Sequence, residues 1–143
     1  MFNRCRPLFA LGLALLVPRA ILAQQASAPP TPVAPRQALS EMRDALRQLV
    51  TGEEAYWAQH ESYTTNLDAV RAGMRVQPAK NVVLSIHHAG GRAWAGSAEH
   101  RDLPNRSCVI YVGSIEDFPA PATRKDGARP TAKETGMPLC DQP

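Results

Sequence analysis

The segment from Gln37 to about His60 constrains the fold most, because apolar residues recur along it at three- and four-residue steps. This spacing places them on one face and predicts a single long amphipathic helix, which begins at Gln37 or near the capping residue Ser40. The apolar positions are Leu39, Met42, Leu46, Leu49, Val50, Tyr56 and Trp57. At 1.5 Å per residue, such a helix measures about 36 Å. A chain of 143 residues can cover it only if the helix is the spine of the fold.

Beyond the helix, the period of the apolar residues changes. Residues 62–74 hold a turn and a short second helix, capped by Asn66 or Thr65 and ended by Gly73. Alternation at a period of two then predicts strands. The expected strands are residues 82–87, 92–99 and 108–112, joined by turns at 89–91 and 102–105. A three- to four-stranded antiparallel meander packed on one long helix makes a two-layer α+β domain.

Residues 1–23 have the pattern of a signal peptide. A basic start precedes an apolar run from Leu8 to Val17, which is about half the length of roughly 20 residues that a spanning helix needs. We expect cleavage between Ala23 and Gln24, and therefore a periplasmic or extracellular protein. The alternative is a retained membrane anchor. Arg19 argues against an anchor, because a charge there is costly in hydrocarbon.

Removal of this leader changes the charge of the product. The whole chain has 16 Lys and Arg against 13 Asp and Glu, and the leader carries three arginines and no acid, so 13 of each remain. A neutral product gives no argument for binding nucleic acid. Residues 24–36 are rich in proline and alanine, which predicts an extended linker before a folded domain at 37–143.

Residues 113–143 show little periodicity and predict a long irregular loop, which needs a staple to stay ordered. After cleavage, Cys108 and Cys140 are the two remaining cysteines. In an exported domain they most simply form one disulfide, which would fasten the loop to the third strand. Closing about 32 residues contributes roughly 3–4 kcal/mol on the chain-entropy account. The alternative is two free thiols.

No motif in the sequence indicates catalysis, so we expect a protein that is not an enzyme and carries no cofactor and no metal. His87 and His88 are neighbours in a strand and should point to opposite faces, which prevents them from binding one metal ion together. His100 with Glu99 and Asp102 is a candidate cation site or acid–base pair. The alternative for His100 is a solvated strand end.

Four aromatic residues hold most of the aromatic mass of the chain. They are Tyr56, Trp57, Tyr63 and Trp94. They are expected either to pack between the helix and the sheet or to form a stacking surface for a glycan or a partner protein.

Several short segments follow one another along the chain in a characteristic order. They are EAYWA at 54–58, YTTNL at 63–67, GRAWAGSAEH at 91–100, SCVIYVG at 107–113 and GMPLCD at 136–141. In this order the chain resembles the globular heads of type IV pilins and pseudopilins. The resemblance implies a pilin-like head with a disulfide-bounded C-terminal loop, in the periplasm or outside a bacterial cell. It also implies a role on a type IV pilus or a type II secretion machine, or one independent of both.

The chain departs from the pilin pattern at its start. Pilins carry a processing site of the Gly-Phe-Thr-Leu-Ile-Glu type, followed by a retained apolar helix, and this sequence has no such site. We therefore expect an exported, non-enzymatic module that acts on an unidentified protein partner through its surface. The alternatives are a membrane-anchored minor pilin that keeps its leader and a small extracytoplasmic enzyme that uses His100. The candidate surface comprises Gly90, Gly91, Pro119 and Pro121, because contacts usually lie on loops of a rigid scaffold.

Overall fold

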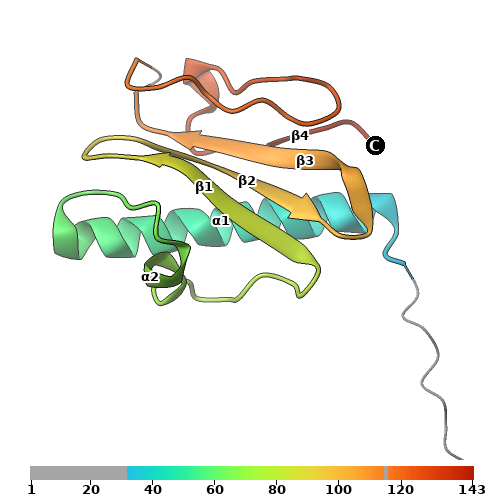
Figure 1. Cartoon of the computed structure of the whole chain (residues 1–143), viewed down its shortest axis with the longest axis horizontal. Helices are drawn as coiled ribbons and strands as arrows, with labels where there is room; N and C mark the ends of the chain where they lie inside the picture. The colour runs from blue at the N-terminus through green and yellow to red at the C-terminus, as the bar shows by residue number, and fades with distance from the viewer. Residues whose placement is uncertain (1–31, 115) are drawn as a thin grey trace, which may run out of the picture. The chain divides into compact units, whose positions relative to one another are not determined.

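The computed structural model describes residues 32–114 and 116–143, and these form two layers, one helical and one a sheet (Figure 1). The expected signal peptide, its cleavage between Ala23 and Gln24, and most of the expected linker lie outside the described residues. The elements are α1 (Pro35–His60), α2 (Leu67–Arg71), β1 (Val82–Ala89), β2 (Trp94–His100), β3 (Leu103–Val112), η1 (Ala132–Glu134) and β4 (Leu139–Cys140).

Helix α1 is the predicted spine. It begins at Pro35, two residues before the expected start, because proline is tolerated at the first helical position, where its missing N–H would have no partner. It ends at His60, and the next residue, Glu61, has a left-handed backbone whose N–H donates to the Trp57 carbonyl at 2.7 Å. Its buried face consists of Ala38, Leu39, Met42, Ala45, Leu46, Leu49, Gly52 and Glu53.

Helix α2 lies directly against α1. Asn66 caps it, because its side-chain oxygen accepts the N–H groups of Asp68 and Ala69 at 3.1 and 3.3 Å. A Cβ atom at Gly52 would lie 2.5 Å from the Val70 carbonyl oxygen, so only glycine permits this approach. A residue with poor helix propensity is thus retained in α1 because the packing of the two helices needs it.

The sheet is an antiparallel meander with strand order β1-β2-β3-β4. Strand β3 begins at Leu103, five residues before the expected start, so the turn after β2 is shorter than predicted. The short β4 pairs with β3, with Cys140 opposite Cys108 and Leu139 opposite Val109. The four strands confirm the predicted α+β architecture.

One core fills the space between α1 and the inner face of the sheet. Its largest members are Leu39, Met42, Leu46, Leu49, Trp94 and Ile110. The predicted disulfide between Cys108 and Cys140 is present, and both cysteines belong to this core. The disulfide therefore fastens the end of the chain to the middle of β3.

The buried carboxylate of Asp141 adds a second attachment beside this disulfide. It accepts the backbone N–H groups of Ser107 at 2.8 Å, Asp126 at 2.8 Å and Lys125 at 3.1 Å. Burial of this carboxyl raises its pKa, but the backbone donors outweigh burial, and the pKa of Asp141 lies below its ordinary value. The C-terminal segment is thus held by a covalent bond and by an ionised side chain.

Candidate interaction surface

The turn between β1 and β2 is held against the end of α1. The Gly90 carbonyl accepts the Tyr63 N–H at 3.1 Å, and the Gly91 carbonyl accepts the indole N–H of Trp57 at 3.2 Å. No atom lies within 4 Å of a Cβ built at Gly90 or Gly91, and neither has a left-handed backbone. Neither packing nor backbone geometry requires these two glycines, and they leave bare backbone at the surface.

The structure brings this turn next to the C-terminal segment. Residues 89–93 together with Asp117 and Phe118 line a shallow hollow of about 300 Å³. Pro119 is exposed and follows the lining residue Phe118, whereas Pro121 is half-buried, and neither proline lines the hollow. The predicted glycines therefore line the hollow, whereas the predicted prolines follow its lining residue Phe118 in the chain.

Phe118 fixes the C-terminal wall of this hollow. Its ring lies 5.1 Å from that of His88 and 5.6 Å from that of Tyr111, in an edge-to-face arrangement with Tyr111. Ala95, Tyr111 and Ala120 form a second small core there. Burial of the Tyr111 hydroxyl and the nearby carboxylate of Asp117 both raise the pKa of Tyr111. The wall is thus an aromatic cluster on the face of the sheet that lies away from α1.

The aromatic side chains divide between the two expected roles. Trp94 is fully buried, Tyr63 is half-buried, and Trp57 is 40% exposed. Their rings follow one another at 6.5 Å from Trp94 to Tyr63 and at 6.4 Å from Tyr63 to Trp57. The series runs from the core to the surface beside Gly91, so Trp57 is the member that a partner can reach.

A buried acid supports the same end of the molecule. Glu53 is fully buried, one carboxyl oxygen accepts the Thr64 N–H at 3.2 Å, and the other has no partner among the described residues. Burial, opposed by that hydrogen bond, raises the pKa of Glu53 to about 7. The neighbouring Glu54 is exposed and accepts the Tyr63 hydroxyl at 2.9 Å. Burial and this hydrogen bond raise the pKa of Tyr63 to about 12.

His87 and His88 do not point to opposite faces, contrary to the prediction. The register of β1 against β2 shifts between Ile86 and His88, which is a β-bulge. His87 contacts the Ser97 hydroxyl at 2.8 Å and His88 stacks on Phe118, so both rings lie on the face away from α1. A bulge inserts one residue and breaks the alternation on which the prediction relied.

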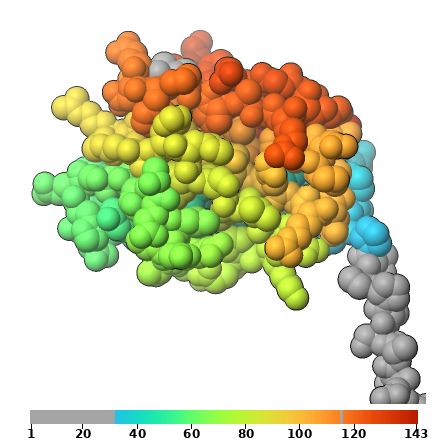
Figure 2. Space-filling view, viewed as in Figure 1, coloured from blue at the N-terminus to red at the C-terminus, as the bar shows by residue number. Residues whose placement is uncertain are grey.

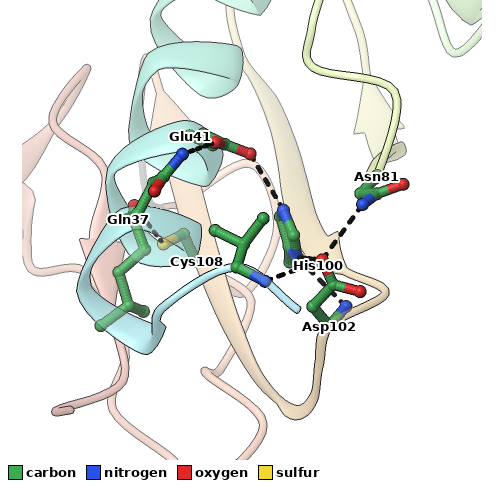
Figure 3. A network of polar contacts seen from close by, with 8 residues as sticks. Gln37, Glu41, Asn81, His100, Asp102 and Cys108 are labelled. Carbon is green, nitrogen blue, oxygen red and sulfur yellow. Dashed lines mark hydrogen bonds and ion pairs between the residues drawn. The ribbon is translucent and has the colours of Figure 1, made fainter. Parts of the chain in front are cut away.

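His100 is buried rather than solvated. Figure 3 shows its polar contacts. Its Nδ1 accepts the backbone N–H of Asp102 at 3.2 Å, which leaves the hydrogen on Nε2 to donate to Glu41 at 3.0 Å. The Asp102 carboxylate accepts from Asn81 at 3.1 Å and from the backbone of Val33 at 3.4 Å. These contacts join the start of α1 to the turn between β2 and β3.

Only part of the predicted histidine cluster is therefore present. Asp102 lies beside His100 as expected, but Glu99 forms an ion pair with Arg124 instead. Sequence reasoning missed Glu41, which lies 59 residues from His100 along the chain, and no local pattern signals such a pair. With no exposed surface on its side chain, His100 serves to align α1 with the sheet and presents no atom to a substrate.

Comparison with known proteins adds no family to these observations. No protein-family model matches the chain, and no curated protein matches it. Within residues 32–114 and 116–143, no helix has both the length and the apolar character that crossing a membrane requires. The same residues contain no cluster of three or more His, Cys, Asp or Glu side chains that could hold a metal ion.

Proposed function

We propose that this protein is an exported, non-enzymatic, pilin-like module that acts through surface contact with a protein partner. The observation that carries the proposal is the order of its parts: one long helix, an antiparallel meander and a disulfide that joins the C-terminal segment to β3. This order is the one implied by the resemblance to pilin heads. On that resemblance, the partner is a component of a type IV pilus or a type II secretion machine.

The contact surface in this proposal is the hollow between the β1–β2 turn and Phe118. Three features support it: bare backbone at Gly90 and Gly91, an indole ring beside them, and a wall that the second core fixes. A turn without side chains beside a partly exposed aromatic ring forms a surface that a protein partner can approach closely. A rigid scaffold beneath exposed turns lowers the entropy cost of binding.

The first test is the intact mass of the protein from separate cell fractions, measured with and without reductant. The proposal expects a soluble exported species that begins near Gln24 and is two hydrogens lighter before reduction than after it. A membrane-bound species that keeps its N-terminus would overturn export by cleavage. That result would favour the anchored minor-pilin alternative instead.

The second test locates the contact. A photo-crosslinking residue at position 91 should capture a partner in the native host, whereas the same residue at Arg75, exposed between α2 and β1, should not. The Gly91 position tolerates the change because no atom lies within 4 Å of the added Cβ. Equal capture from both positions, or capture from position 75 alone, would remove the hollow as the contact surface.

A further inference from the structure

Strand β1 is the first strand in the sheet order, so its other edge has no neighbour among the described residues. The Asn81 carbonyl accepts the Arg101 N–H at 3.0 Å, on the side of β2. The backbone N–H and C=O groups of successive residues alternate between the two sides of a strand. Those of Leu84 and Ile86 therefore point away from β2. No hydrogen bond within the described residues occupies their outward N–H and C=O groups. Figure 2 shows β1 at the surface, uncovered by the C-terminal segment above it.

This edge has few of the features that usually prevent strands from pairing between molecules. Natural sheets protect exposed edges with charged side chains, proline, bulges or very short strands. β1 has eight residues and contains no Lys, Arg, Asp, Glu or Pro, and its one bulge follows Ile86. The side chains beside the edge include Val83, which is 44% exposed, and Ser85, which is also exposed. The opposite edge, β4, is protected by its length of two residues.

We propose that the exposed edge of β1 pairs with β1 of a second copy of this chain, antiparallel about a two-fold axis at Ser85. In this register, Leu84 of one copy exchanges hydrogen bonds with Ile86 of the other. Ser85 faces its own counterpart as a non-hydrogen-bonded pair, where a small side chain permits the close approach. The pairing joins two four-stranded sheets into one continuous sheet.

The charge pattern makes a second copy of this chain an acceptable occupant of the edge. Antiparallel self-pairing places each residue opposite a residue of the same strand, so like charges meet wherever a strand carries them near its centre. β1 carries no fixed charge, and in this register its nearest cation, Lys80, lies opposite Gly90. The strand is therefore self-complementary. The contact is also small, and an interface below about 1,200 Å² is weak and transient, so the dimer should form only at high concentration.

Sedimentation equilibrium of the protein as recovered from its host tests the proposal over a range of concentrations. The wild type should associate to a dimer on the order of 0.1 to 1 mM. The variants S85K and S85D should each remain monomeric at these concentrations, because each places two like charges at the axis. An equimolar mixture of the two should recover the dimer, since opposite charges then face each other. A wild type that stays monomeric, or variants that still dimerise, would overturn the proposal.

Hydrogen exchange of the wild type gives a second measurement that needs no folded variant. The amide hydrogens of Leu84 and Ile86 should exchange more slowly as concentration rises, because pairing occupies them. Those of Val83 and Ser85 face β2 and should not change. A concentration effect on all four, or on none, contradicts pairing at this edge. The partner of the proposed function does not enter either experiment, so the two proposals stand or fall separately.

Discussion

The two sides of the sheet are secured by different kinds of bond. On the β4 side, a disulfide and the Asp141 carboxylate hold the C-terminal segment to β3. On the β1 side, the turn rests on single hydrogen bonds from Tyr63 and Trp57, and the loop before α2 rests on one accepted by Glu53. The outer edge of β1 is open, whereas β4 is short and fixed.

This difference shows how a small domain distributes its stability. A C-terminal segment with little secondary structure has few backbone pairs of its own, so covalent and ionic attachments replace them. The β1–β2 side has strand pairing along most of its length, interrupted by one bulge, and needs less support. It is therefore the side that can leave backbone groups exposed, which both the proposed contact surface and the proposed dimer require.

Loss of the disulfide should have the largest effect. Replacing Cys108 and Cys140 together by alanine should lower the free energy of unfolding by roughly 3–4 kcal/mol, because the unfolded chain gains the entropy of an open loop. Denaturant unfolding of both proteins measures this difference. The wild type unfolded in reductant is the control, since it lacks the same bond but keeps both cysteine side chains. Equal midpoints for the double variant and the wild type would show that the β4 side is held mainly by other contacts.

Glu53 should destabilise the β1 side above neutral pH. The pKa of Glu53 in the folded protein is about 7, against an ordinary 4.5. The contribution of the protonated carboxyl to stability is therefore fully present below pH 4.5 and is lost as the pH rises through 7. The variant E53Q should therefore be more stable than the wild type at pH 8, on the order of 3 kcal/mol, and similar to it at pH 4.

Thermal unfolding of E53Q at both pH values measures this effect. The variant E54Q, at an exposed neighbouring position, should not show the same pH-dependent gain. A stability difference between E53Q and the wild type that is constant from pH 4 to pH 8 would contradict ionisation of Glu53 in this range.

The variant D141N should lower stability on the β4 side by about 1–3 kcal/mol, because backbone donors lose a charged acceptor. The pKa of Asp141 lies below its ordinary 3.8, so its contribution is present above that pH and is lost as pH falls through the folded value. The deficit of D141N at pH 7 should therefore shrink in acid. D68N, which changes a surface ion pair, should remain within about 0.5 kcal/mol of the wild type.

The smallest effect is expected at the turn. Gly90→Ala should change the free energy of unfolding by less than about 0.5 kcal/mol, because nothing lies within 4 Å of the new Cβ. The matched variant G113A should cost far more, since Gly113 has a φ of 103° and its Cβ would overlap the Arg92 carbonyl oxygen. A large loss from Gly90→Ala would mean that the fold, rather than the surface, requires this glycine.

Sequence reasoning found the features that repeat locally or follow from a count. The apolar period revealed α1, alternation revealed most of the meander, and two remaining cysteines indicated the disulfide. It placed the start of β3 too late, because Leu103 to Arg106 do not alternate in polarity. The two residues of β4 are too few to show a period.

The polar contacts of the site were beyond such reasoning. Glu41 with His100, and Asp141 with Ser107, join residues far apart in sequence, and each pair depends on the final packing. The bulge in β1 likewise has no local signal, so the faces of His87 and His88 could not be assigned. Gly90 and Gly91 were predicted as a turn, but only the fold places Phe118 beside them.

The bond between Cys108 and Cys140 also makes a closed covalent ring from part of the backbone. A protease that cuts once within this ring, in the exposed stretch around Lys125, opens the ring but releases no fragment. Both new ends stay attached, one through β3 and the other through β4. A domain built in this way keeps its mass, apart from one added water molecule, and its C-terminal strand after a single cut. Only reduction after cleavage separates the two pieces.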